Sequence, residues 1–571
     1  MRTFFRSRRI ILILGLIVLF SFFVRVWKID KVPPSLFGDE LDVGYQAYSI
    51  LKTGKDYSGR MIPLQFRSFT EYRTPLYLYS AVPTVAVFGI TPLGVRLPAV
   101  FFGVCGVIAI YLLVSEITGS KVLGTLSSLL LAVSPWHIHY SRAGFEVTLL
   151  LSLFIFGLYF FLRGLRSPQW FIPSAVFLVL TPWAYSTAQL YLPLTIFFLL
   201  ILWSRNIFRP KAKGYVLISG LIFLFISIPY AWSTYFGGGT DRFSSLSIFN
   251  NPVMEGSVGE KRFEDGLMLP LISKIGLDRV FHNKYVFFLD EFGKNYIKTF
   301  STEFLFLSGD GNPRHNSSGT GELYTIEAVL LLIGLHFLYK ANIDKRKKWL
   351  VVILLLTASI PSSLTIDGSN HATRLILLLI PLTIIVSYGL YGLCEVVLQR
   401  YKKVLIVLIA LSYLASFVSY QHFYWIHFPL ATEKSWQYGW EQVVNEAINY
   451  SGQYQRVIIS SHSSPAYLYF LAWSQYSPVL YQRQKDFNTV DVVGFGKARQ
   501  IGNVYFPLED QGYNLYNVSS VLDKDTLYVV PFDEFKLDLI KEPMRLPLDL
   551  SLVQTVKYLS GEPAFYFITK K

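Results

Sequence analysis

Charged residues are scarce in this sequence. Asp, Glu, Lys and Arg together make up 16% of its 571 residues, whereas a soluble globular domain carries about 25%. The shortfall is concentrated in long apolar runs that extend to about residue 420, and the remaining sequence has the composition of a water-soluble chain. These features predict a membrane protein with a soluble C-terminal part.

Cysteines and nucleotide-binding motifs are also rare or missing. The two cysteines, Cys105 and Cys394, both lie inside apolar runs, which indicates neither a disulfide framework nor a zinc site. No GxGxxG or Walker-type loop stands in the context that such motifs require, so nucleotide-sugar or ATP chemistry on a soluble fold is unsupported. Ionisable residues inside the apolar runs are too few for a proton-coupled pump.

The apolar runs predict an α-helical polytopic protein, because a helix needs about 20 apolar residues to cross the hydrocarbon core. The run from residue 76 to 89 is short and contains Pro83, so we predict a re-entrant or juxtamembrane helix there. The first run follows a basic cluster but lacks a small-residue cleavage site, which predicts a retained span. The 11 predicted spans are 10–27, 93–117, 121–136, 146–164, 169–185, 188–204, 214–232, 324–340, 349–366, 372–394 and 403–421.

The net charge of +14 falls in short clusters between these runs, which is typical of membrane topology rather than of nucleic-acid binding. If residues 76–89 do not cross, nearly all basic clusters share the side of the N-terminal arginines, and this side is then the cytoplasm. We therefore predict a multi-pass protein of the cell membrane with a cytoplasmic N-terminus and an extracytoplasmic C-terminal domain. The predicted outer regions are 28–92, 134–146, 233–323 and 422–571.

The tail mixes helix and strand patterns. A helical pattern runs from Trp436 to Ile448, and short strand-like runs cover 456–460, 526–530 and 564–568. These patterns predict a small α/β domain over 422–571, following a transmembrane domain over 1–421.

The first outer region opens with three acids, Asp39, Glu40 and Asp42. Leu41, Tyr45 and the following apolar residues have helical spacing, which predicts an amphipathic helix with Asp39 at or just before its N-terminus. Taken alone, Asp39 is best interpreted as a helix cap, with the other acids favoured by the helix dipole. The functional alternative is a carboxylate held at the membrane surface as a general base.

The second outer region, Ser134-Pro135 to Glu146, is rich in aromatic and basic residues. His137 and His139 are two positions apart, which is not the helical spacing of a zinc pair. Arg142 could bind an anion or extend to lipid headgroups, and Glu146 is either a dipole-favoured acid or a functional one.

Three further polar segments lie on the predicted outer face. Tyr72-Arg73-Thr74-Pro75 precedes the short run, and His371-Ala372-Thr373-Arg374 opens the span from 372. A histidine and an arginine at such a position suit a phosphate that projects from a lipid, although extension to lipid headgroups explains a single arginine as well. Residues 309–315 predict a turn.

Together these segments resemble one known group, the GT-C glycosyltransferases, and specifically glycosyltransferase family 39. That family includes protein O-mannosyltransferases and the lipid A aminoarabinose transferase. The resemblance covers roughly residues 10–420 in order and spacing. It rests on Gly38-Asp39-Glu40, Tyr72-Arg73-Thr74-Pro75-Leu76-Tyr77, Pro98, Ser134-Pro135 to Arg142 with Glu146, and His371-Ala372-Thr373-Arg374 followed by Pro381.

The resemblance implies an inverting transfer of a sugar from a polyprenyl-phosphate carrier to a hydroxyl acceptor on the outer face, the acceptor being a lipid, glycan or protein. It implies a base role for Asp39, orientation or acceptor binding for Glu40, and the place of the second acid for Glu146. Arg73 departs from the family pattern, in which the basic residue often directly precedes the loop proline. The donor-phosphate candidates are Arg73, Arg142, His371 and Arg374, and the sugar or acceptor candidates are Asp42, Tyr72 and His139.

No metal ligand is predicted. Some GT-C enzymes use a divalent ion beside the loop acids, whereas family 39 members generally do not, so a divalent cation stays an open alternative. The expected partners are the lipid-linked sugar, membrane lipids and the acceptor, without nucleic acid.

Two other classes of function predict different sequence features. A transporter or flippase of lipid-linked glycans predicts polar residues at mid-membrane and two pseudo-symmetric halves, neither of which the sequence shows. A binding module anchored in the membrane needs far fewer than 11 spans.

Overall fold

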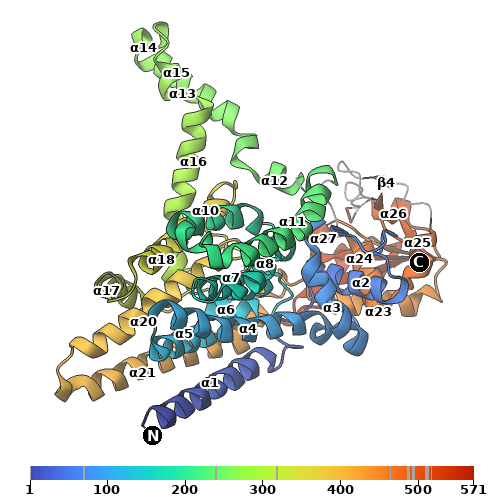
Figure 1. The fold of residues 1–571 in the computed structure, drawn as a ribbon. Coiled ribbons are helices and arrows are strands. Elements are labelled where there is room, and N and C mark those ends of the chain that lie inside the picture. The colour runs from blue at the N-terminus through green and yellow to red at the C-terminus, as the bar shows by residue number, and fades with distance from the viewer. Residues whose placement is uncertain are drawn as a thin grey trace. The chain divides into compact units, whose positions relative to one another are not determined.

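The computed structural model describes the chain except residues 1, 69–70, 238, 240, 317–318, 463–464, 485–488, 491–495, 508–513 and 516 (Figure 1). The chain forms two compact units, each built from segments that are far apart in the sequence. Unit 1 contains Met1–Arg25, Phe101–Ser141 and Glu146–Gln421, and unit 2 contains Val26–Val100, Arg142–Phe145 and His422–Lys571. The division at residue 421 stays a prediction, because the first outer region groups with the tail.

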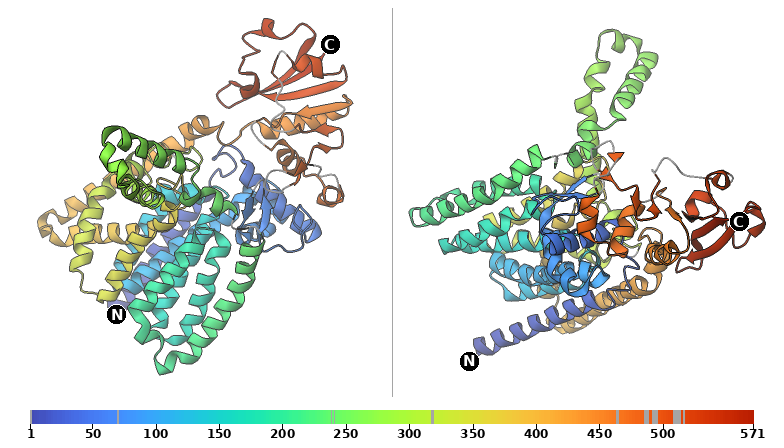
Figure 2. Two further views of the ribbon diagram at one scale, coloured as in Figure 1. Left: turned by 90° about the horizontal axis from the view of Figure 1, so that it is seen from above. Right: turned by 90° about the vertical axis from the view of Figure 1, so that its right-hand side faces the viewer.

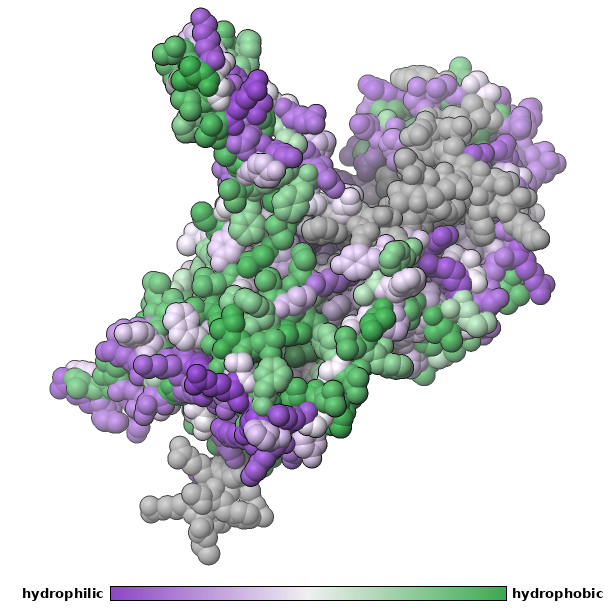
Figure 3. Space-filling view, turned by 45° about the horizontal axis from the view of Figure 1, so that its top comes forward, coloured by the Kyte–Doolittle hydropathy of each residue, from purple (hydrophilic) through white to green (hydrophobic). Residues whose placement is uncertain are grey.

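Unit 1 is helical. Its long helices carry apolar residues on all sides, as expected of helices that face both protein and lipid. Figure 3 shows hydrophobic side chains covering much of the visible face of this bundle. Its α-helices, with α1, α4 and α21 extending into unit 2, are α1 (Arg2–Val26), α4 (Pro92–Thr118), α5 (Lys121–Val133), α6 (Pro135–Tyr140), α7 (Val147–Gly164), α8 (Phe171–Val179), α9 (Thr181–Ala184), α10 (Ala188–Ile207), α11 (Lys213–Phe236), α12 (Asp241–Leu246), α13 (Met254–Met268), α14 (Pro270–Lys274), α15 (Asp278–Phe281), α16 (Lys284–Thr299), α17 (Ile326–Lys340), α18 (Lys345–Thr357), α19 (Ile360–Ser363), α20 (Leu379–Val396) and α21 (Gln399–His422).

Helix length corrects the predicted number of spans. In the described part of the chain, seven helical segments are long and apolar enough to cross a membrane. They correspond to the predicted spans that begin at 10, 93, 146, 188, 214, 372 and 403. The polytopic helical fold is confirmed, and the count of full-length spans falls from 11 to seven.

The other four predicted spans are shorter helices, namely α5, α8 with α9, α17 and α18. Proline accounts for two of the breaks, because Pro182 is the second residue of α9, which follows α8, and Pro361 is the second residue of α19, which follows α18. The 13 residues of α18 extend about 20 Å, which is less than the hydrocarbon core of about 30 Å. The short run at 76–89 is likewise a helix of only 14 residues, α3 (Pro75–Phe88).

Helices α17 and α20 pack closely through glycine. A Cβ atom added at Gly389 would lie 2.2 Å from the carbonyl oxygen of Leu330, and one at Gly334 would lie 2.0 Å from that of Ile385. Small residues allow this approach of two backbones, which stabilises helix pairs in lipid.

The connector from α11 to α17, which is predicted to lie on the outer face, is mostly helical in its described residues. Helices α13 to α16 extend away from the rest of unit 1 as an arm (Figures 1 and 2). The connector ends in the loop 309–316, which returns to the bundle.

Unit 2 combines the first outer region with the tail. Helix α2 (Gly38–Thr53) packs against α3 and against α24 (Ala466–Trp473) and α25 (Pro478–Arg483). The strands β1 (Phe66–Ser68) and β2 (Glu71–Arg73) form a hairpin before α3. The other α-helices of the tail are α22 (Phe428–Thr432), α23 (Trp440–Ser451), α26 (Val518–Val521) and α27 (Phe532–Phe535).

The tail holds a six-stranded mixed sheet in the order β6-β7-β3-β8-β10-β9 (Figure 2). β3 pairs in parallel with β7 and β8, whereas β10 is antiparallel to β8 and β9. The predicted strands are confirmed as β3, β8 and β10, and the predicted helix is confirmed as α23. The strand bounds are β3 (Arg456–Ile459), β4 (Thr489–Val490), β5 (Gly496–Lys497), β6 (Gln500–Ile501), β7 (Val504–Tyr505), β8 (Thr526–Pro531), β9 (Leu550–Lys557) and β10 (Pro563–Lys570).

Candidate functional site

Asp39 is the second residue of α2, which begins at Gly38 and follows Phe37 as its N-cap. The capping interpretation is therefore wrong. The backbone N–H of Gly38 donates instead to the side-chain oxygen of Gln437, at 2.8 Å. Asp39 is half-buried, and no hydrogen bond or ion pair reaches its carboxylate from the described residues.

Glu40, the next residue, has both carboxylate oxygens occupied. Its Oε1 accepts from Arg96 Nε and from the backbone N–H of Gly144, each at 2.7 Å, and its Oε2 accepts from Arg96 Nη2 at 2.8 Å. Both side chains are fully buried. Arg96 also donates to the backbone carbonyls of Ile29, Pro33 and Ser35. Glu40 thus connects α2, α4 and the 142–145 segment through one buried ion pair.

Asp42 is also fully buried, one helical turn from Asp39. Its Oδ2 lies 3.6 Å from Arg73 Nη1. Burial raises the pKa of Asp42 to about 7, and the positive charge of Arg73 opposes that rise. The same Arg73 nitrogen donates to the backbone carbonyl of Asp39 at 3.0 Å. The buried Arg73 side chain therefore holds the backbone at Asp39 in place through a hydrogen bond.

Arg142 is fully buried and bonded within unit 2. It donates to the backbone carbonyls of Lys28 and Val32, and its guanidinium lies 4.5 Å from the ring centre of Trp425. Tyr72 is half-buried, and its hydroxyl accepts from Arg67 at 3.4 Å.

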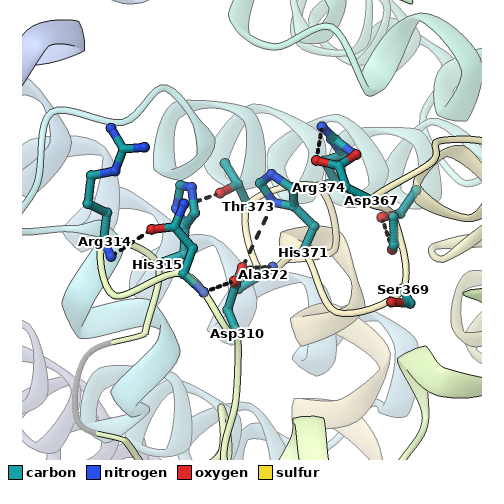
Figure 4. A network of polar contacts seen from close by, with 12 residues as sticks. Asp310, Arg314, His315, Asp367, Ser369, His371, Ala372, Thr373 and Arg374 are labelled. Carbon is teal, nitrogen blue, oxygen red and sulfur yellow. Dashed lines mark hydrogen bonds and ion pairs between the residues drawn. The ribbon is translucent and has the colours of Figure 1, made fainter. Parts of the chain in front are cut away.

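A second polar cluster forms in unit 1, where α6, the loop 309–316 and the loop 367–374 meet (Figure 4). His315 Nδ1 lies 3.1 Å from the Tyr140 hydroxyl and 3.0 Å from the Thr373 hydroxyl, and these two hydroxyls are 2.9 Å apart. His139 Nε2 contacts the backbone carbonyl of Arg314 at 2.8 Å. Burial lowers the pKa of His315 well below its usual value, and the charges of His371 and Arg314 add to this effect.

Asp310 joins the two loops of this cluster. Its Oδ1 accepts from the backbone N–H of Asn312, and its Oδ2 accepts from that of Ala372, each at 2.8 Å. The same Oδ2 lies 4.0 Å from His371 Nδ1. Burial raises the pKa of Asp310 to about 6 and also raises that of Glu322, whose Oε1 accepts from the backbone N–H of Asp310.

Arg374 and Glu146 complete the predicted residues. Arg374 is buried and donates to Asp367 and to the Thr365 hydroxyl, each at 2.6 Å. Glu146 is buried as the N-cap of α7, without a side-chain capping bond. The structure thus brings Asp39, Glu40, Asp42, Tyr72, Arg73 and Arg142 into unit 2, and Glu146, His139, His371 and Arg374 into unit 1.

The described side chains also bear on whether a metal ion could bind. Among them, no group of three or more His, Cys, Asp or Glu residues has an arrangement that could hold a metal ion.

Sequence reasoning missed several residues of these clusters. Arg96 is a single arginine at the start of an apolar span, and such an intramembrane charge is itself a signal of function or of a buried partner. Asp310 and His315 were assigned only to a turn. His315 contacts Tyr140 and Thr373, and Asp310 accepts from the backbone N–H of Ala372; these contacts join positions more than 50 residues apart, which no local pattern indicates.

Comparison with known families identifies the type of protein. Residues 72–232 match the family described as "Dolichyl-phosphate-mannose-protein mannosyltransferase". The chain is a membrane glycosyltransferase. The predicted resemblance to family 39 is confirmed, although the matched segment is less than a third of the chain. No curated protein matches the sequence significantly.

Two solved structures of ArnT share the fold of this chain. ArnT from Cupriavidus metallidurans bound to undecaprenyl phosphate superposes with a TM-score of 0.52 at 10% identity, covering 98% of each chain. ArnT from the same organism in the apo state gives 0.51, also at 10% identity and 98% coverage of each chain. The archaeal oligosaccharyltransferase AglB from Archaeoglobus fulgidus gives a TM-score of 0.47 at 12% identity. The aligned region covers 82% of this chain and 64% of the AglB chain. At 10% identity the likeness to ArnT establishes the fold alone.

Proposed function

We propose that the glycosyltransferase moves a sugar from a polyprenyl-phosphate carrier to a hydroxyl acceptor on the outer face of the membrane, with inversion at the anomeric carbon. The family match and the ArnT-like fold, solved with undecaprenyl phosphate, support a lipid-phosphate donor. A phosphate leaves readily, so one carboxylate that deprotonates the acceptor hydroxyl is sufficient, provided that cations hold the phosphate.

The observation that carries this proposal is the free carboxylate of Asp39. Of the three acids at the start of α2, Glu40 is bound to Arg96 and Asp42 is buried beside Arg73. Only Asp39 is half-exposed with no bonded partner among the described residues. A general base must be able to approach the acceptor hydroxyl, and Asp39 alone of the three can do so.

The remaining residues take roles that their contacts allow. Glu40, Arg73 and Arg142 are proposed as positioning residues, because their polar groups bond within unit 2. His371 and Arg374 remain the candidates for the donor phosphate, with Glu146 as the second acid. Asp42, Tyr72 and His139 remain candidates for positioning near the sugar or acceptor.

Substitution of Asp39 tests the proposal. The Asp39→Asn variant keeps the size and the hydrogen-bonding shape of the side chain but removes the base, so sugar transfer in membranes supplied with polyprenyl-phosphate sugar is expected to fall by at least about 100-fold. Asp39→Glu, which keeps the carboxylate, should retain part of the activity. Equal transfer by Asp39→Asn and the parent protein, at equal protein level, would refute the base assignment.

Donor class is tested separately by thermal unfolding. Polyprenyl phosphate should raise the unfolding temperature of the purified protein, because a ligand that binds only the folded state stabilises it. The control is an uncharged polyprenol of the same chain length, which should have little effect. A uniform rise with both lipids would argue against recognition of the phosphate.

A further inference from the structure

An apolar groove of about 840 Å³ lies in unit 1 between α5, α20 and α21. Leu126 and Leu130 of α5, Leu390 of α20, and Ile409 and Leu414 of α21 are among the side chains that form its walls. An unfilled space of this size would forfeit many van der Waals contacts and destabilise the helices around it. The groove therefore calls for an apolar occupant.

The length of the groove indicates a chain-like occupant. Its lining residues on α21 run from Lys402 to Phe417, a distance of about 22 Å at 1.5 Å per residue. One leaflet contributes about 15 Å of the hydrocarbon core. Within α21 only Tyr420 is buried by protein, so this helix depends on something other than side-chain packing along the groove. An acyl chain of a membrane lipid fits both observations.

One end of the groove is charged. Lys402 and Glu395 line it there, and Lys402 Nζ lies 3.7 Å from Glu395 Oε1, a long and partly exposed ion pair. Arg400 and Lys403 lie beside Lys402 in the first turn of α21. Of these three cations only Lys402 lines the groove, and with Glu395 as the one nearby acid of the lining they give this end of α21 a net positive charge. Basic pockets between transmembrane helices recognise the headgroups of anionic lipids such as cardiolipin.

We propose that this groove binds an anionic phospholipid, with one acyl chain between α5, α20 and α21 and the headgroup phosphate on Lys402. The phosphate would take the place of Glu395 as the partner of Lys402. This lipid is distinct from the sugar donor, because the basic residues 400–403 at the start of α21 lie on the predicted cytoplasmic side, whereas donor binding is predicted on the outer face. The proposal stands whether or not the assignment of Asp39 is correct.

The cysteines provide a direct readout. Cys394 lines the groove, whereas Cys105 lies on α4 outside it, and both are half-buried. The protein would be placed in nanodiscs of phosphatidylcholine alone or of phosphatidylcholine with cardiolipin, and an uncharged maleimide would label both thiols. Cardiolipin is expected to slow labelling of Cys394 several-fold and to leave Cys105 unchanged. Equal slowing of both thiols, or none at Cys394, would overturn the proposal.

Charge variants identify the headgroup contact. Lys402→Gln is expected to weaken the protection of Cys394 by cardiolipin by about fivefold, since each basic residue contributes about that factor. Lys211→Gln, which removes an exposed charge from another basic connector, is the matched control and should keep full protection. Glu395→Gln should strengthen protection, because the phosphate then has no competitor for Lys402. Full protection in Lys402→Gln, or protection by polyprenyl phosphate alone, would exclude an anionic phospholipid as the specific occupant.

Discussion

Three carboxylates within four positions of α2 differ in their surroundings more than in their chemistry. Asp39 keeps a free, half-exposed carboxylate, Glu40 forms a buried ion pair, and Asp42 sits in an environment that favours its protonated form. The sequence could place all three near a helix start, because that depends on local spacing. It could not separate their roles, because the partners Arg96 and Gly144 are 56 and 104 residues away.

Removing the Glu40 carboxylate should destabilise the protein strongly. The Glu40→Ala variant leaves Arg96 as a buried charge without its acid, which costs about 3–5 kcal/mol of unfolding free energy. Thermal unfolding in detergent measures this effect. Glu562→Ala breaks an exposed pair with Lys434 in the same unit and should cost no more than about 1 kcal/mol. Similar losses in the two variants would contradict a structural role for the Glu40 pair.

Asp42 should make stability depend on pH. Its folded-state pKa of about 7 is raised above the ordinary 3.8, so between these values the folded protein binds more protons than the unfolded chain. The free energy of unfolding therefore falls as pH rises from about 4 to about 7 and is constant above that. Asp42→Asn removes this group, so its unfolding temperature should decline less over that range than that of the parent.

The exposed Asp30 provides the control for this pH series. Asp30→Asn removes one exposed carboxylate from the same unit and therefore controls for the loss of a negative charge. The burial of Asp310 and Glu322 in unit 1 gives the parent protein a residual slope of the same sign, so the informative quantity is the difference between Asp42→Asn and the parent. Parallel curves for these two proteins would contradict the raised pKa.

Among the helices and strands, the sequence predicted those whose pattern is local. The strands β3, β8 and β10 and the helices α2 and α23 follow from apolar alternation and helical spacing. The lengths of the membrane spans are harder to predict, because hydropathy alone does not reveal the helix breaks near Pro182 and Pro361. Residues 309–315 are predicted as a turn, and only tertiary packing places His315 beside Tyr140.

The glycine contact between α17 and α20 gives a prediction for these two helices. Gly389→Val would force a side chain against the Leu330 carbonyl, so the helices must separate. The expected loss is at least about 1–3 kcal/mol, seen as a lower unfolding temperature. Gly220 lies in the apolar helix α11 with nothing within 4 Å of an added Cβ, so Gly220→Val should leave stability nearly unchanged. The packing argument fails if both variants behave alike.

For the whole molecule, sidedness in the membrane remains a prediction from positive charge. On a chain without Cys105 and Cys394, a cysteine at Arg166 should react with an impermeant thiol reagent only after permeabilisation, and one at Met61 should react without it. Met61 is 70% exposed, whereas Asp42 in the same outer region is fully buried and would give no signal on either side. Reaction of Arg166→Cys in intact cells would reverse the orientation.

Residues 28–92 group with the tail in unit 2, and this limits which parts of the chain can be exchanged with those of a relative. Gln437 accepts from the first N–H of the helix that carries Asp39, Tyr45 donates to the backbone of residue 476, and Gln482 donates to Ser49 and Thr53. The tail and residues 28–92 therefore depend on matching contact surfaces. A chimera that takes its tail from a relative must take residues 28–92 with it, and removing the tail would disturb the loop that carries Asp39 even if the tail never touches a sugar.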